Sequence, residues 1–222
     1  MLRTHTCGEL RIEDDGREVT AHTPNTGSMK QCAVPGHPVL LSRSDNPTRK
    51  LPFTLELIRV GRHWVDTHTH RTNRVVEEAL RRGWIPELAG YTVTPEFRFG
   101  KSRIDFLLEK GRERALVEVK NVTLVGDSGA ACFPDAPTER GRKHLRELLA
   151  ARQEGYRAVI FFLVQRGEAS AFTPADDIDP ATKRFGLLAI VDTAYHLNQG
   201  QAGVAGKNFG FFIYLAGQLP GR

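Results

Sequence analysis

Two neighbouring stretches, SRIDFLLE (residues 102–109) and RALVEVKN (residues 114–121), decide the fold of the second half of this chain. Apolar and polar residues alternate along both stretches with a period of two, which is typical of β-strands. The four residues between them, KGRE (110–113), are a turn signal. The sequence therefore predicts a β-hairpin centred on Gly111 and Arg112.

Two carboxylates and a lysine come together in this hairpin. A hairpin that is symmetric about its turn places Asp105 opposite Glu118, and Lys120 opposite Arg103. Opposed residues in an antiparallel pair have Cβ atoms about 5 Å apart, so two like charges there destabilise the strands. A divalent cation between them removes this repulsion, because Mg²⁺ takes carboxylate oxygens and completes its shell with water and substrate phosphate.

Lys120 completes the pattern of a metal-dependent phosphodiesterase. It lies two residues beyond Glu118 on the same strand face, where its charge can stabilise a negatively charged transition state. The alternative is a charged and solvated strand face, since a D…ExK pattern is short. Asp105, Glu118 and Lys120 are therefore candidate catalytic residues, with Asp105 and Glu118 as metal ligands.

Several longer motifs surround the hairpin in a fixed order. They are PNTGSM (24–29), SRSDNPTRKLP (42–52), NRVVEEAL (73–80) and FPDAPTERGRKHLREL (133–148). Together with the hairpin, they resemble the sugar fermentation stimulation protein family, SfsA, over about residues 19–180. The resemblance implies a mixed α/β fold: an N-terminal OB-like β-barrel in residues 1–65, followed by a PD-(D/E)xK nuclease-like αβββαβ domain in residues 66–222.

Helical periodicity begins at Asn73 and ends at the stop signal Gly83, with one apolar face formed by Val75, Val76, Ala79 and Leu80. Glu77 and Glu78 flank this face symmetrically, so the periodicity leaves open which of them points towards the hairpin. The resemblance favours Glu78 as a further catalytic and metal-site residue. An ordinary exposed helix charge is the alternative for either glutamate.

A second helix is predicted from the capping residue Thr138 to about Gln153. Its expected buried stripe is Leu145, Leu148 and Leu149, and its first half is crowded with basic residues, His144 among them. The uniformly apolar stretch at residues 158–164 then predicts a central strand that is buried on both faces. Helix, three strands, helix and strand make a mixed α/β core.

Basic charge predicts a polyanionic partner. The net charge is +5 and the isoelectric point is near 9.3, and neutralising phosphates releases counterions. A generic basic cytosolic protein is the alternative. The expected partner is DNA, with RNA left open, and the expected cofactor is Mg²⁺ or Mn²⁺. The candidate nucleic-acid contacts are Arg43, Arg49 and Lys50 in an exposed loop, Arg103 on the hairpin, and, from the resemblance, Arg140 and Lys143.

The sequence thus predicts a nucleic-acid-binding protein that hydrolyses phosphodiesters with Mg²⁺ or Mn²⁺. A non-catalytic DNA-binding regulator of sugar-utilisation genes is the alternative, which fits the basic charge and the family's name. An oligosaccharide-binding OB module is disfavoured, because aromatic residues make up only 8% of the chain. Endonuclease or exonuclease action, sequence preference and oligomeric state stay open.

The expected location is the cytoplasm, without membrane contact. The three cysteines form no CxxC pair, which favours a reducing compartment. No signal sequence is apparent, and the longest apolar run, at residues 158–164, is far shorter than the roughly 20 residues of a transmembrane helix.

Both ends of the chain depart from the family pattern. Residues 1–10 lack the basic and aromatic strand with which members usually begin, so we expect the first barrel strand to be missing or altered. From residue 181 the expected helix and apolar strand are replaced by other residues and a Gly-rich stretch at 200–206. The last core strand is therefore not predicted.

Overall fold

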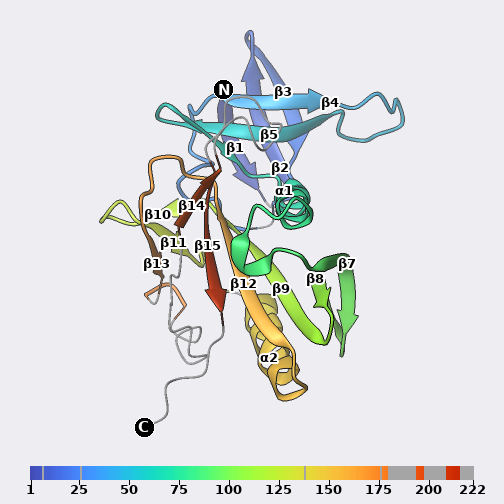
Figure 1. Ribbon diagram of the computed structural model, residues 1–222. Coiled ribbons are helices and arrows are strands. Elements are labelled where there is room, and N and C mark those ends of the chain that lie inside the picture. Colours follow the sequence, from blue (N-terminus) through green and yellow to red (C-terminus); the bar gives the residue numbers. More distant parts are fainter. Residues whose placement is uncertain are drawn as a thin grey trace.

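The computed structural model describes residues 1–6, 8–25, 27–137, 139–175 and 177–179, with only the backbone for residues 4–6, and the backbone of two further strands at residues 194–197 and 209–215. These residues form two six-stranded sheets, a small three-stranded sheet and two α-helices, shown in Figure 1. The N-terminal sheet lies at one end of the molecule, and the second large sheet, with a helix on each face, makes up the rest.

The N-terminal sheet has the order β1-β2-β3-β5-β4, with β6 also paired to β5. Its strands are β1 (Leu2–Thr6), β2 (Glu9–Asp14), β3 (Arg17–His22), β4 (Val39–Arg43), β5 (Phe53–Val60) and β6 (His63–Asp66). Alternating apolar residues such as Leu10, Ile12 and Leu55 point to one shared core. The first strand is present: β1 pairs with β2, and Leu2 is fully buried.

The second sheet has the order β14-β15-β12-β9-β8-β7. Its strands are β7 (Thr92–Phe99), β8 (Ser102–Lys110), β9 (Glu113–Val122), β12 (Arg157–Val164), β14 (Ala194–Leu197) and β15 (Phe209–Leu215). Because β12 lies between β9 and β15 and its residues 158–164 are buried, the predicted central strand is confirmed. A strand that the sequence did not predict, β15, pairs with the far edge of β12.

Helix α1 (Thr69–Arg81) covers one face of this sheet, and α2 (Glu139–Gln153) covers the other. The order of helix, three strands, helix and strand is as predicted. Helix α1 begins at Thr69 rather than Asn73, and its N-cap residue, His68, makes no side-chain capping bond that could signal this start. The predicted cap Thr138 of α2 lies outside the described residues. Neither helix combines the length and apolar character needed to cross a lipid bilayer, within the part of the chain that the structure describes.

The remaining elements are short. A 3₁₀ turn, η1 (Pro86–Leu88), follows α1, and the small sheet contains β10 (Leu124–Val125), β11 (Ala131–Phe133) and β13 (Phe172–Pro174). Strand β10 follows β9 in the chain, and its residue Val125 contacts Gln31 in the segment between β3 and β4. This position allows the small sheet to contact both halves of the chain.

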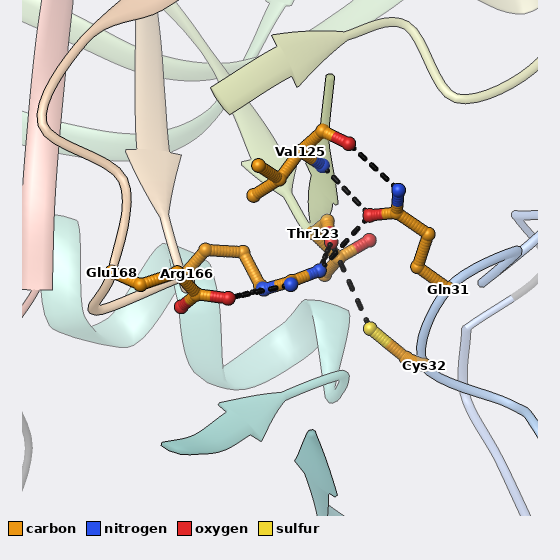
Figure 2. A network of polar contacts seen from close by, with 6 residues as sticks. All are labelled: Gln31, Cys32, Thr123, Val125, Arg166 and Glu168. Atoms are coloured by element: carbon orange, nitrogen blue, oxygen red, sulfur yellow. Dashed lines mark hydrogen bonds and ion pairs between the residues drawn. The ribbon is translucent and has the colours of Figure 1, made fainter. Parts of the chain in front are cut away.

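Figure 2 shows the polar contacts that join the two halves. Gln31, in the segment between β3 and β4, donates from its amide nitrogen to the carbonyl of Val125 at 2.7 Å, and its Oε1 accepts from the Val125 N–H at 2.9 Å. Buried Arg166, just beyond β12, donates to that Oε1 and to the carbonyl of Thr123, at 3.1 and 3.0 Å. Arg166 also pairs with Glu168. Satisfied polar groups in a buried junction fix the relative position of the two halves.

We expect Arg166→Met to lower the free energy of unfolding by about 3 kcal/mol, because two buried acceptors, on Thr123 and Gln31, lose their charged donor. Urea denaturation followed by circular dichroism measures the change. Arg62→Met, at an exposed turn between β5 and β6, is the matched control and should change stability by less than about 0.5 kcal/mol. Equal stability of the two variants would contradict a structural role for this junction.

Candidate active site

The hairpin of β8 and β9 has the predicted register, but its ladder ends just before the two carboxylates. Paired residues run from 110 and 113 at the turn to 106 and 117. Asp105 is not part of this described ladder; instead, its Oδ2 accepts a hydrogen bond from the Val119 N–H at 2.7 Å. The regular pairing predicted for Asp105 with Glu118, and for Lys120 with Arg103, is therefore replaced by a side-chain contact.

Asp105 is held by donors from two elements. In addition to the Val119 N–H, Asn73 of α1 donates from its amide nitrogen to Oδ1 at 2.7 Å. Burial, followed by the nearby charge of Glu118, nevertheless raises the pKa of Asp105 to about 6. Its negative charge is therefore only partly compensated by the surrounding protein.

Glu118 is almost completely buried, with 3% of its surface exposed. Its Oε1 accepts a hydrogen bond from Lys120 Nζ at 2.6 Å and contacts Nδ1 of His144 on α2. Burial by itself would raise the pKa of Glu118, but Lys120 and His144 outweigh it and hold this pKa below its usual value. The other oxygen, Oε2, is buried and has no hydrogen-bond partner among the described residues.

Strand alternation explains why these side chains meet. Leu116, Glu118 and Lys120 share one face of β9, and Leu116 packs in the core formed with α2. Glu118 therefore points towards α2, where His144 belongs to the buried stripe of the helix with Leu145, Leu148 and Ala151. Both large helices thus contribute a polar side chain to the site: Asn73 from α1 and His144 from α2.

The two carboxylates and Lys120 line a cavity of about 740 Å³. Both halves of the chain form its walls. The segment after β3 contributes Asn25 and Gly27, α1 contributes Asn73 and Glu77, and the start of α2 with the segment before it contributes Asp135 and Arg140. The hydroxyl of Ser28 donates to Asp135 at 2.9 Å, so the walls from the two halves are in direct contact.

The structure brings Asp105, Glu118 and Lys120 together, as the sequence predicts, but it turns Glu78 away. Glu78 borders a separate depression on the outer side of α1 and pairs with Arg82 at 2.9 Å. Glu77 lines the cavity instead. Glu78, which the family resemblance favours, therefore lies outside the cavity, whereas Glu77, four residues from Asn73 and so on the same helix face, borders both the cavity and the outer depression.

The predicted nucleic-acid contacts fall into two groups. Arg140 lines the cavity, and Arg103 and Lys143 line a neighbouring depression. The other three, Arg43, Arg49 and Lys50, are exposed at the end of β4 and in the loop that follows it, and they do not line the cavity.

Sequence reasoning missed two residues of the site, Asn73 and His144. In the sequence, Asn73 marks the start of a helix, and His144 is one of several basic residues in the first half of the second helix. Residues four apart lie on the same helix face, so the spacing from Asn73 to Glu77 and from His144 to the core residue Leu148 indicates on which face each side chain lies.

Comparison with known proteins identifies the family. Residues 8–66 match the family model described as the SfsA N-terminal OB domain, and residues 70–190 match the sugar fermentation stimulation protein RE domain. The chain belongs to the SfsA family. The fold is accordingly α/β with an N-terminal OB domain, as predicted.

Curated and solved members of the SfsA family agree with this assignment. The sugar fermentation stimulation protein homolog of Syntrophotalea carbinolica is 69% identical over 166 residues, which cover 75% of this chain and 72% of that protein. The homolog of Geotalea daltonii is 52% identical over 209 residues, which cover 93% of this chain and 88% of that protein. The structure of Pyrococcus furiosus SfsA in complex with Ca²⁺ matches with a TM-score of 0.75 and 25% identity, covering 83% of this chain and 79% of that one.

We expect Asp105→Asn to change how stability depends on pH in a chelator. The folded-state pKa of Asp105, about 6, lies above its ordinary value of 3.8, so the folded protein takes up a proton that the unfolded chain releases. The parent protein should therefore gain stability as the pH falls through 6, and the variant should lack this gain. Between pH 8 and pH 5 the difference should be about 1 kcal/mol.

Urea unfolding in EDTA at several pH values measures this difference. Parallel pH profiles of the parent protein and the variant would show that Asp105 is not a perturbed acid.

Proposed function

We propose that this SfsA protein is a nuclease that hydrolyses phosphodiester bonds with the help of Mg²⁺ or Mn²⁺, with DNA as the expected substrate and RNA left open. The observation that carries the proposal is the pair of carboxylates, buried Glu118 and half-buried Asp105, beside Lys120 in one cavity. This combination unites hard oxygen ligands with a positive charge, as phosphodiester hydrolysis requires.

The residues present fit a divalent cation. Glu118 has a buried oxygen without a partner among the described residues, and Asp105 has a raised pKa. A bound cation would give the unpaired Glu118 oxygen a partner and would also compensate the negative charge of Asp105. No ready cluster of three or more His, Cys, Asp or Glu residues occurs in the described part of the chain. The backbone carbonyl of Val119, water and substrate phosphate would therefore complete the shell, as is usual for Mg²⁺.

The solved relative supports the same cofactor class. Pyrococcus furiosus SfsA is described in complex with Ca²⁺, a hard divalent cation that prefers oxygen ligands, like Mg²⁺. We carry over to this chain only the preference for a hard divalent cation.

Each side chain has a defined task in the proposed reaction. Asp105 and Glu118 would hold the cation, which when bound supplies Lewis-acid stabilisation of the phosphate and an activated water. Lys120 places a positive charge where negative charge develops on the phosphate. His144 and Lys120 hold one oxygen of Glu118 and leave the other free, while Asn73 fixes the orientation of Asp105.

A non-catalytic DNA-binding regulator of sugar-utilisation genes is the alternative, which the name of the relatives, sugar fermentation stimulation protein homolog, suggests. Such a regulator has no need for two neighbouring carboxylates in one cavity. Their mutual repulsion is a cost that ligation of a cation explains and phosphate binding by itself does not.

We expect Asp105→Asn and Glu118→Gln each to abolish cation-dependent cleavage while leaving nucleic-acid affinity nearly unchanged. Both substitutions keep the side-chain shape and remove the charge that holds the cation. Labelled single- and double-stranded DNA and RNA, incubated with Mg²⁺, Mn²⁺ or EDTA, provide the cleavage assay. Cleavage at the parent rate in either variant would refute the site assignment.

Adjacent glutamates on α1 provide a matched pair of variants. Glu77 lines the cavity and Glu78 does not, so Glu77→Gln should lower the cleavage rate by about tenfold or more, while Glu78→Gln should stay within about twofold of the parent. Both glutamates pair with an arginine four residues further on, at 2.8 and 2.9 Å, so each variant loses one ion pair at the helix surface. If Glu78→Gln instead lowered the cleavage rate more than Glu77→Gln, Glu78 would be the glutamate that acts in the site.

Binding measurements separate the nuclease from the regulator. Contacts to backbone phosphates give an affinity that falls linearly with salt on logarithmic axes and varies little between sequences. In EDTA, random and promoter-derived duplexes should therefore bind within about tenfold of each other at physiological salt. A salt-resistant preference of about 10³-fold or more for one promoter, without cleavage in Mg²⁺ or Mn²⁺, would favour the regulator.

A further inference from the structure

A second hollow of about 520 Å³ adjoins the candidate active site, between the start of β8 and the first half of α2. We call it the basic depression and define it by six of the residues that line it: Lys101, Ser102, Arg103, Arg140, Lys143 and Arg146. Five of these six carry a positive charge. The one acid that borders the hollow is Glu139.

Most of this positive charge is not neutralised by the protein. Glu139 pairs with Arg142, which lies outside the depression, at 2.6 Å. Arg103 approaches Glu96 at 3.2 Å, but their side chains are 71% and 55% exposed, so this ion pair contributes little. The other cations of the depression form no ion pair with the residues that the structure describes. A concave surface with unpaired cations attracts anions.

Ser102 provides independent evidence for a ligand. It is the first residue of β8, is only 8% exposed and lines the depression. Its buried hydroxyl has no hydrogen-bond partner among the described residues. An unsatisfied buried polar group costs about 1–3 kcal/mol, so a ligand oxygen that accepts from this hydroxyl would remove a real penalty.

The depression shares a wall with the candidate active site. Arg140 lines both hollows. His144 also borders the depression, and on its other side it contacts Glu118. A nucleic-acid strand whose phosphate enters the cavity would therefore have a cationic path along Arg140 into the depression.

We propose that the basic depression is a second phosphate subsite, which holds an internal backbone phosphate of the nucleic-acid strand that enters the cavity. The inference rests on the proposed function of that cavity. Ser102 donates a hydrogen bond to the phosphate, and Lys101 and Arg146 neutralise its charge. The hollow is larger than one phosphate group, and its cations are dispersed around it, so it suits a backbone that passes through.

The binding test uses EDTA, in which no cation-dependent cleavage occurs. We expect Lys101→Gln and Arg146→Gln each to weaken binding of DNA oligonucleotides, single-stranded or duplex, and to reduce the slope of log affinity against log salt by about 0.7–0.9. Arg112→Gln, an equal loss of charge in the exposed turn between β8 and β9, is the matched control and should change neither quantity.

Oligonucleotides with a 5′-phosphate and with a 5′-hydroxyl distinguish the two kinds of phosphate. If the subsite holds an internal phosphate, Arg146→Gln should weaken the binding of both oligonucleotides by the same factor. If Arg146→Gln lowered the affinity only for the 5′-phosphorylated oligonucleotide, the depression would bind a terminal phosphate and the proposal would be overturned. Absence of binding by the parent protein, or a loss of affinity in Arg112→Gln as large as in Arg146→Gln, would also overturn it.

Ser102→Ala tests the site without changing charge. Because the hydroxyl has no partner in the described protein, its removal should leave the melting temperature unchanged or raised, while affinity should fall about two- to tenfold. A lower melting temperature with unchanged affinity would make Ser102 a structural residue and contradict the subsite. If Asp105→Asn leaves cleavage unaffected while Arg146→Gln still loses affinity, the active-site assignment fails and the phosphate subsite stands.

Discussion

The second half of the molecule is organised around one electrostatic constraint: the buried carboxylate of Glu118 and the half-buried carboxylate of Asp105 share one cavity. Each carboxylate therefore needs compensation from neighbouring elements. Glu118 obtains it from Lys120 on its own strand and from His144 on α2, and Asp105 obtains it from Asn73 on α1. The two helices that cover opposite faces of the sheet thus both contribute to the same site.

This constraint also explains the irregular end of the hairpin. Asp105 bonds to the Val119 N–H through its side chain, where a regular ladder would use a backbone carbonyl. On the other side of β8, Glu96 of β7 has a φ of 55°, and the ladder between β7 and β8 omits this position. An interrupted ladder redirects a side chain without breaking the sheet, which is a common way to build a functional site on strands.

The prediction from sequence succeeded where local patterns determine the structure. Alternation and the turn signal predicted the hairpin and its register between residues 106 and 117, and the uniformly apolar run predicted the central strand β12. Periodicity could not separate Glu77 from Glu78, because both flank the apolar face of α1 equally. Long-range contacts had no local signal at all: Arg166 and Gln31 are 135 residues apart in the chain.

Helix α2 shows how these requirements combine in one element. Its inner face carries His144 and the core residues that pack on β12, while Arg140, Lys143 and Arg146, each three residues apart, border the basic depression. A cation in the first turn of a helix, such as Arg140, is unfavourable, because the helix dipole is positive there. A phosphate reverses this balance, since both the dipole and the cations attract it. An anionic ligand in the basic depression, as proposed, would account for these basic residues. The same helix would then support Glu118 on one side and a nucleic-acid backbone on the other.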